Sequence, residues 1–277
     1  MSGNYSEIII RAKDYYDSHD ADEFYYRVWG GEDFHLGIYH YDDEPIFDAS
    51  RRTVKTMAGL VHLNQDSKVL DIGAGYGGAA RYLARKYGCK VWCLNLSEKE
   101  NERNRAKNEE MGLNHLIVVI DGCFEDLPFE DDFFDIIWSE DAILHSGEKD
   151  KVIAEAARVL RPRGEFVFTD PMQADDCPEG VLQPVLDRIN LESMGSMSLY
   201  RELASKNGLE EVFWVDLGKH LPRHYARVKT ELERNYDQML DVISQEYMDN
   251  MLKGLSHWVN AGNNGYLHWA VLYFIKK

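Results

Sequence analysis

The chain has 277 residues, of which 44% are hydrophobic, so it can bury a large core, and its length suits one elaborated α/β domain. Lys and Arg total 31 against 48 Asp and Glu, and the net charge of −17 excludes nucleic acid and anionic membrane surfaces as expected partners. No apolar run reaches the roughly 18 residues of a membrane span, and the first segment offers only Ile8–Ile10. We therefore expect a cytoplasmic protein whose four cysteines are reduced thiols.

The first part of the chain is rich in Tyr, Phe and Trp and is interrupted by Gly30, Gly31 and Gly37. We interpret residues 1–62 as a helical cap over a ligand crevice. Residues 63–175 are then the core, and residues 176–277 add helices and the last two strands. Because repeats and linkers are absent from the sequence, we expect a single domain over 1–277.

From Ser67 onward, short β-branched runs alternate with charged, helix-periodic stretches, the pattern of a mostly parallel sheet with helices on both faces. The predicted strands are 68–72, 90–96, 116–121, 135–139 and 165–170, and the predicted helices are 78–87, 98–111 and 149–160. Residues 161–164, Arg-Pro-Arg-Gly, predict a turn between the third helix and the fifth strand. Two further predicted strands, 209–217 and 266–275, flank a helix-rich segment starting near Pro222 and close the far edge of the sheet.

The strongest local signal is a strand that enters a glycine-rich turn and then a helix. Asp71, Gly73 and Gly75 lie at the end of this strand and in the turn, where glycine permits close approach of a ligand to the backbone. A turn that binds nothing is the alternative. Asp71 would repel a pyrophosphate and attract an ammonium, which favours the methionine end of S-adenosylmethionine (SAM) over NAD.

The ends of the next strands carry further candidate cofactor-binding residues. Asn95, followed by Leu96, stands where nucleoside-binding folds grip ribose hydroxyls, although an Asn that only caps the next helix is the alternative. Asp121, with Gly122 and Cys123, can accept from an exocyclic amine such as that of adenine, or can simply form a turn. Ser139 ends the fourth strand, which lies centrally and faces the crevice.

The order of these motifs resembles that of class I SAM-dependent methyltransferases with a Rossmann-like fold. The residues that carry this resemblance are 69–78, 95–97, 121–124, 127–135 and 159–164. More closely, residues 29–32 with His35, Gly37 and Tyr39, residues 139–146 and residues 169–173 look like sarcosine and dimethylglycine N-methyltransferases of glycine betaine synthesis.

The resemblance implies roles for individual residues. Asp71, Gly73 and Gly75 would line the methionine end of SAM, Asn95 would hold the ribose, and Asp121 with Cys123 would hold adenine. Asn95 departs from the more common acidic residue, which puts the strength of ribose binding in doubt more than its location.

Methyl transfer to an amine requires alignment, exclusion of water and an unprotonated nitrogen. His145 is the candidate proton acceptor, with a packing histidine as the alternative, and Tyr26 is a second catalytic candidate. Tyr26, Trp29 and Tyr39 are cap aromatics suited to a methylated ammonium, or are ordinary core residues. Pro171 and Met172 either shape the acceptor pocket or form a plain loop. No metal is expected.

A carboxylate on the acceptor calls for an arginine fork, and the sequence does not choose among the candidates. They are Arg27, Arg51, Arg52, Arg223 and Arg227. The predicted function is N-methylation of sarcosine and dimethylglycine. The alternatives are a methyltransferase for phosphoethanolamine, a tocopherol or a quinone precursor, and a non-catalytic SAM-binding protein. Oligomeric state stays open.

Overall fold

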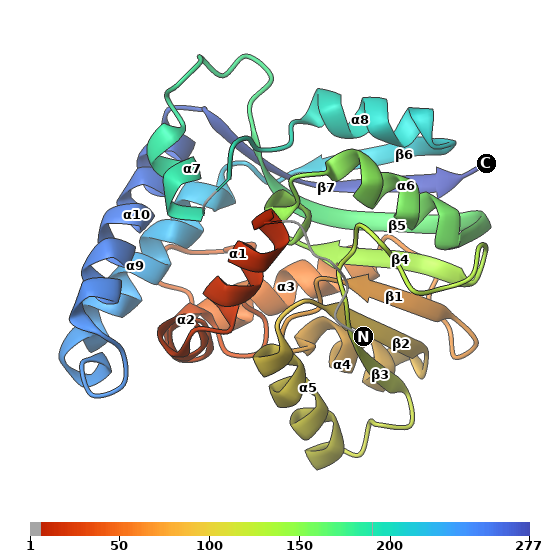
Figure 1. Ribbon diagram of the computed structural model, residues 1–277, viewed down its shortest axis with the longest axis horizontal. Coiled ribbons are helices and arrows are strands. Elements are labelled where there is room, and N and C mark those ends of the chain that lie inside the picture. The colour runs from red at the N-terminus through yellow and green to blue at the C-terminus, as the bar shows by residue number, and fades with distance from the viewer. Residues whose placement is uncertain (1–6, 190) are drawn as a thin grey trace.

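The computed structural model describes residues 7–189 and 191–277, and within them the strands form one seven-stranded sheet of order β3-β2-β1-β4-β5-β7-β6 (Figure 1). The strands are β1 Lys68–Ile72, β2 Lys90–Asn95, β3 Ile117–Asp121, β4 Phe134–Glu140, β5 Leu160–Gln173, β6 Leu209–Asp216 and β7 Leu267–Lys276. The first five are parallel, and β7 runs antiparallel to β5 and β6. The predicted Rossmann-like α/β fold is confirmed, including the last two strands at the far edge.

Helices cover both faces of the sheet, because the apolar residues of the central strands alternate between two cores. Ile136 and Trp138 of β4 pack in one core with side chains of α3, α4, α9 and α10, whereas Phe134 and Ile137 pack in the other with α6 and α8. The helices are α1 Glu7–Tyr16, α2 His19–Phe24, α3 Ile46–Ala58, α4 Gly78–Tyr87, α5 Glu98–Glu110, α6 Lys149–Val159, α7 Gln183–Ile189, α8 Met197–Lys206, α9 His220–Met239 and α10 Gln245–Asn263, with a π-helix η1 Tyr25–Trp29 and a 3-10 helix η2 Ile143–His145. Across the described residues, none is long and apolar enough to cross a membrane.

The turn predicted at residues 161–164 is present as a bulge inside β5: Leu160 pairs with Phe134 and Glu165 with Ile136, so four residues of β5 stand opposite one of β4. The chain leaves α6 at Val159 and enters β5 directly at Leu160, with Arg163 in a left-handed conformation, φ 63°. β5 also extends to Gln173, because β7 pairs with it from Glu165 to Gln173. Pro171 and Met172 therefore lie inside the strand rather than in a loop after it.

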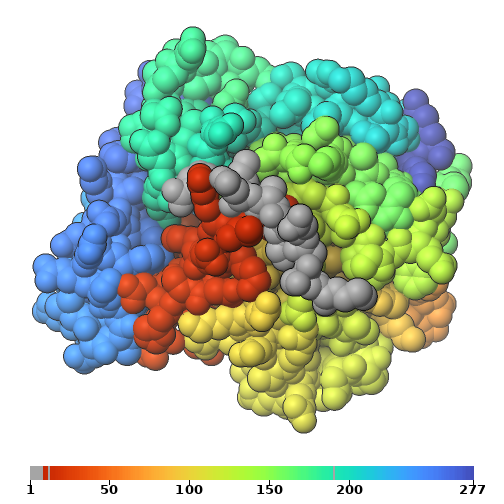
Figure 2. Space-filling view, in the orientation of Figure 1, coloured from red at the N-terminus to blue at the C-terminus, as the bar shows by residue number. Residues whose placement is uncertain are grey.

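The N-terminal segment crosses the carboxyl ends of the parallel strands, between α9–α10 and α5 (Figures 1 and 2). Tyr15 of α1 and Tyr247 of α10 share a hydroxyl hydrogen bond of 3.1 Å, and the Ser244 hydroxyl at the start of α10 donates to Asp20. Residues 30–45 contain no helix and join η1 to α3. The predicted cap is thus helical at both ends and irregular in its middle.

Candidate active site

A pocket lies where the carboxyl ends of β1, β2 and β4 meet the underside of the N-terminal segment. This is the edge of an open α/β sheet at which ligands bind. Ten of the residues predicted from sequence line it: Trp29, Asp71, Gly73, Gly75, Asn95, Leu96, Gly122, Cys123, His145 and Pro171. The fold thus brings together residues that lie more than a hundred positions apart in the sequence.

The glycine turn has a conformation and a packing that only glycine allows. Gly73 and Gly75 have φ values of 80° and 50°. A Cβ on Gly73 would collide with the Ala142 side chain, and one on Gly75 would collide with the Phe34 ring. The turn is anchored by the Gly73 N–H, which donates to the Leu94 carbonyl at 2.8 Å. The backbone of this turn is therefore exposed to the pocket while the cap packs closely against it.

Four carboxyl groups gather beside this turn. Asp71 is the last but one residue of β1, Glu140 ends β4 and Asp141 follows it, and Asp33 enters from the cap. Burial, with the nearby charges of Glu140 and Asp33, raises the pKa of Asp71 well above its usual range. Burial likewise raises the pKa of Glu140 to about 7, although His35 partly offsets it. The crowded carboxyl groups therefore resist being ionised together, and a bound cation would favour their charged forms.

Two members of the cluster retain unused acceptors. Glu140 Oε1 and both Asp33 carboxylate oxygens are buried without a hydrogen-bond partner among the described residues. Arg51 Nε lies 2.8 Å from Asp33 Oδ2, but the two groups are not aligned for a hydrogen bond. The ion pair therefore balances the charge of Asp33 and leaves its oxygens without a hydrogen-bond donor. Buried acceptors without donors are costly, which fits a ligand that brings an ammonium group as hydrogen-bond donor.

Asn95 is oriented by an acidic residue that the sequence reasoning missed. Its amide Nδ2 donates to Glu100 Oε2 at 2.8 Å, which leaves Oδ1 directed away from that contact. Glu100 also lines the pocket, and burial raises its pKa to about 8 despite the Asn95 bond. The first turn of α5 thus places an acidic group in the pocket beside Asn95, five residues after it in sequence.

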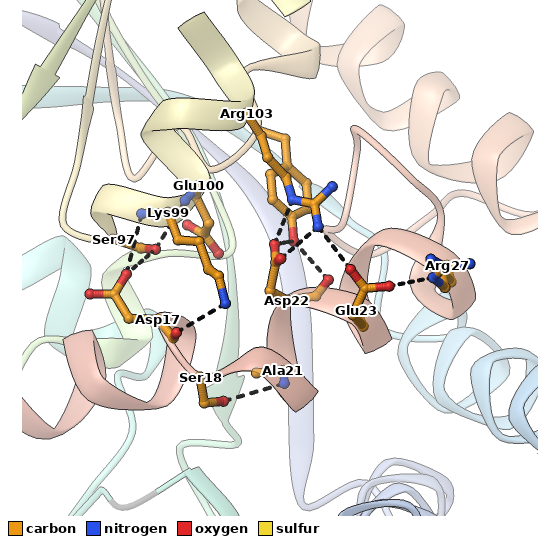
Figure 3. A network of polar contacts seen from close by, with 11 residues as sticks. Asp17, Ser18, Ala21, Asp22, Glu23, Arg27, Ser97, Lys99, Glu100 and Arg103 are labelled. Atoms are coloured by element: carbon orange, nitrogen blue, oxygen red, sulfur yellow. Dashed lines mark hydrogen bonds and ion pairs between the residues drawn. The ribbon is translucent and has the colours of Figure 1, made fainter. Parts of the chain in front are cut away.

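A polar network attaches α1 and α2 to the N-terminus of α5 (Figure 3). The Ser97 hydroxyl donates to Asp17 Oδ1 at 2.7 Å and accepts from the Glu100 N–H at 3.2 Å. Arg103 binds Asp22 through Nε at 2.8 Å and Nη2 at 2.6 Å. The network therefore holds the roof of the pocket to the helix that carries Glu100.

His145 lies in the pocket as predicted, and its partner is Tyr16 of the cap. The Tyr16 hydroxyl and His145 Nε2 are 2.8 Å apart. Burial, reinforced by the positive charges of Lys149 and Arg188, lowers the pKa of His145 to about 4. The imidazole is therefore neutral near pH 7 and is a weak base, so this environment favours hydrogen bonding over proton abstraction.

The structure does not bring five of the predicted site residues into the pocket lining. These are Tyr26, Tyr39, Asp121, Ser139 and Met172. The side chain of Met172, a residue of β5, is fully buried in the core that β5 shares with α6 and α8. Ser139 is fully buried and its hydroxyl donates to the Ile72 carbonyl at 2.8 Å, so it joins β4 to β1.

The other three are held by neighbouring helices. The Asp121 carboxylate accepts from Asn101 at 2.8 Å and Arg105 at 2.7 Å, on the exposed side of edge strand β3. Tyr26 is 44% exposed, packs against Tyr76 of the glycine turn and has Arg103 of α5 over its ring, 4.6 Å from the centroid. The Tyr39 hydroxyl lies 2.9 Å from His224 Nδ1 of α9. A strand-end position therefore does not by itself direct a side chain into the crevice.

The five candidate arginines all form ion pairs within the chain. Their partners are Glu23 for Arg27, Glu32 and Asp33 for Arg51, Glu44 for Arg52, Asp42 for Arg223 and Glu231 for Arg227. None of the five lines the pocket. Arg188, which the sequence reasoning did not consider, does line it. No local motif marks Arg188, because it reaches the site through the packing of α7 on α10.

Comparison with known proteins agrees with this geometry. Residues 70–168 match a family model described as a methyltransferase domain. The chain is 56% identical over its full length to the full-length sarcosine/dimethylglycine N-methyltransferase of Halorhodospira halochloris. It is 55% identical to the enzyme of that name from Aphanothece halophytica, over 96% of each chain.

A solved structure described as a putative sarcosine dimethylglycine methyltransferase from Galdieria sulphuraria superposes with a TM-score of 0.90 at 44% identity. The superposition covers 95% of this chain and 99% of that one. Sequence identity at this level over nearly whole chains extends well beyond the shared sheet, to the cap and to α7–α10. The chain belongs to the sarcosine/dimethylglycine N-methyltransferase family.

Proposed function

We propose that this methyltransferase transfers the methyl group of SAM to sarcosine and to dimethylglycine, the second transfer giving trimethylglycine. The observation that carries the proposal is the pocket's pairing of a buried carboxyl cluster with an aromatic roof. The cluster is Asp33, Asp71, Glu140 and Asp141, and the roof includes Tyr16, Tyr25 and Trp29. Both donor and product are organic cations, which carboxylates and aromatic faces stabilise.

Different residues of the pocket bind different parts of SAM. Asp71 and the glycine turn take the ammonium end, Asn95 with Glu100 takes the ribose diol, and residues 122–124 border the adenine. Asp121 stays a predicted adenine ligand that would need to leave Arg105. When bound, SAM supplies a methyl group whose bond to sulfur breaks, the electron pair staying on sulfur, as the amine lone pair forms the new bond. That the reaction needs no metal stays an expectation from the sequence.

The acceptor side is formed by His145, Tyr16, Pro171 and the aromatic roof. Tyr25 contacts Trp29 and Phe34 with ring centroids 5.3 and 5.2 Å apart, so the roof is a continuous aromatic layer. His145 and Tyr16 position the neutral amine and exclude water, and the amine proton is lost to solvent before transfer. Tyr26 and Tyr39, which face other parts of the fold, act through packing of the cap.

The alternatives receive less support from the site. A phosphorylated acceptor such as phosphoethanolamine would place a dianion beside the carboxyl cluster. The large lipid-like acceptors require a long apolar channel, whereas this lining sets carboxyl and basic groups among its aromatic and aliphatic side chains. Four free thiols, at Cys89, Cys93, Cys123 and Cys177, are in keeping with the predicted cytoplasmic location.

The purified protein is incubated with SAM and, separately, glycine, sarcosine, dimethylglycine and phosphoethanolamine, and S-adenosylhomocysteine and product mass are measured. Turnover is expected with sarcosine and dimethylglycine, and the two rates rank the methylation steps. SAM binding without turnover of any amine would contradict the proposal and would favour a non-catalytic SAM-binding protein. Turnover of phosphoethanolamine alone would reassign the acceptor.

A further inference from the structure

One cation in the pocket has no anionic partner in the described part of the chain. Arg188 lies near the end of α7, and its Nη2 donates to the sulfur of Met251 at 2.9 Å. Its Nε is buried and lacks a hydrogen-bond partner, and no described Asp or Glu forms an ion pair with it. The side chain as a whole is part-buried, and a guanidinium whose buried Nε has no acceptor is unfavourable unless an anion supplies one.

The fold makes room for this side chain in a specific way. Gly254 of α10 faces α7, and a Cβ there would collide with Arg188 Cδ and lie 2.8 Å from Nε. The side chain thus passes over α10 where α10 has no side chain of its own. Glycine inside a helix costs about 1 kcal/mol relative to alanine, so its presence accommodates Arg188 at the expense of helix stability.

The surroundings of Arg188 keep it charged without neutralising it. The groups that act most strongly to raise its pKa, against the lowering effect of burial, are the hydroxyls of Tyr25, Tyr15, Tyr225 and Tyr247. These are neutral near pH 7, so a full positive charge remains at the pocket wall. The same charge contributes to lowering the pKa of His145, which shows that both groups act on one region of the pocket.

The pocket is consequently polarised, with carboxyl groups at the glycine turn and one uncompensated guanidinium on the α7 side. We propose that Arg188 binds the carboxylate of the amino-acid acceptor and so directs the acceptor nitrogen, held near His145 and Tyr16, toward the donor methyl. The inference rests on the proposed function and deepens it by assigning the group that selects an amino acid over a simple amine. The five ion-paired arginines predicted from sequence lack this free fork.

SAM also carries a carboxylate, so the experiment must separate the two sources. Arg188→Met, Arg188→Lys and the control Arg234→Met are compared with wild type. Arg234 is an exposed residue of α9 outside the pocket lining. For each variant, KM and kcat are measured with dimethylglycine and with N,N-dimethylethanolamine, which lacks the carboxylate. SAM affinity and the thermal unfolding midpoint are measured alongside.

We expect Arg188→Met to raise KM for dimethylglycine about 100-fold and to abolish the preference over dimethylethanolamine, with SAM affinity and unfolding midpoint nearly unchanged. Arg188→Lys keeps the charge and loses the fork, so its KM rises about tenfold. Arg234→Met behaves as wild type. Gly254→Ala displaces Arg188 while favouring the helix, so a raised KM in a variant that is no less stable supports positioning over general damage.

Three results would overturn the inference. An unchanged preference for dimethylglycine in Arg188→Met would remove Arg188 from acceptor binding. Weakened SAM binding with an unchanged acceptor KM would assign the guanidinium to the carboxylate of SAM instead. Absence of dimethylglycine turnover by the wild-type enzyme would overturn the proposed function and this inference with it. If the wild type turns dimethylglycine over and Arg188→Met has the same KM and kcat, the inference alone is overturned.

Discussion

Asp71 shows how the position near a strand end changes the chemistry of one side chain. It is 3% exposed, and its pKa is raised because burial and neighbouring carboxyls disfavour its charge. A cationic ligand reverses this balance. The same residue in a solvated loop would carry an ordinary carboxylate and bind little.

Replacing Asp71 with Ala is expected to weaken SAM binding about 100-fold, since a buried charge-assisted contact to the ammonium is lost. The fold should persist, because the substitution removes a buried carboxyl instead of creating one. Titration calorimetry measures the affinity and thermal unfolding checks the fold. Asp66→Ala, in an exposed turn, is the control and should bind SAM normally. Equal affinity of the two variants would remove the assignment of the methionine end.

His145 provides a test of how the amine loses its proton. The pKa of this imidazole is lowered from 6.5 to about 4, so it is already neutral near pH 7 and above. We expect kcat/KM for dimethylglycine to rise with pH as the amine deprotonates, with no separate limb near pH 6.5. His145→Asn should lower the rate about tenfold, or about 1.4 kcal/mol, and leave the pH profile unchanged in shape. Loss of a limb near neutral pH in this variant would instead identify His145 as the proton acceptor.

At the scale of elements, α5 connects the sheet to the cap. Its first turn carries Ser97 as the N-cap and Glu100 in the pocket, and its next turn carries Arg103, which binds the buried Asp22. One helix therefore orients both a carboxyl group of the pocket lining and the roof above it. Its charged sequence predicted a helix, and the partners of these charges became visible only in the folded chain.

Arg103→Met is expected to destabilise the protein by about 3 kcal/mol, because it leaves the 3% exposed Asp22 side chain as an unpaired buried charge. SAM binding should weaken as well, since the cap is no longer held to α5. Arg105→Met, two residues further along the same helix, breaks a pair with Asp121 in which both side chains are over 40% exposed, and should cost under about 0.5 kcal/mol. Chemical denaturation gives both values, and similar losses in the two variants would contradict this account.

The elements themselves could largely be predicted from the sequence. The strand from Lys68 to Ile72 and the helix beginning at Gly78 agree with the structure because hydrophobic periodicity and the glycine turn are local signals. The fifth strand was predicted too short, since its extension to Gln173 depends on pairing with β7 nearly a hundred residues later. The division of the chain at residues 62 and 175 stays a prediction.

At the scale of the whole molecule, the net charge of −17 repels itself more strongly in the compact folded state than in the unfolded chain. Salt screens this repulsion. We expect the unfolding midpoint to rise by roughly 3 °C or more between about 0.05 and 1 M KCl, equivalent to about 1 kcal/mol for a chain of this size. NaCl should act equally at equal ionic strength. A midpoint that falls or stays constant would show that specific ion pairs outweigh the overall repulsion.

The sequence by itself determined the fold class, the order of the cofactor motifs and the membership of a methyltransferase family. These follow from periodicity and from short contiguous motifs such as the strand and glycine turn around Asp71. Only the tertiary structure decided which polar side chains enter the pocket. Asp121 and Tyr39 are held outside by α5 and α9, whereas Tyr16, Glu100 and Arg188 are brought in. The reason is physical: a side chain's direction and its partners depend on packing between elements distant in sequence, which no local pattern encodes.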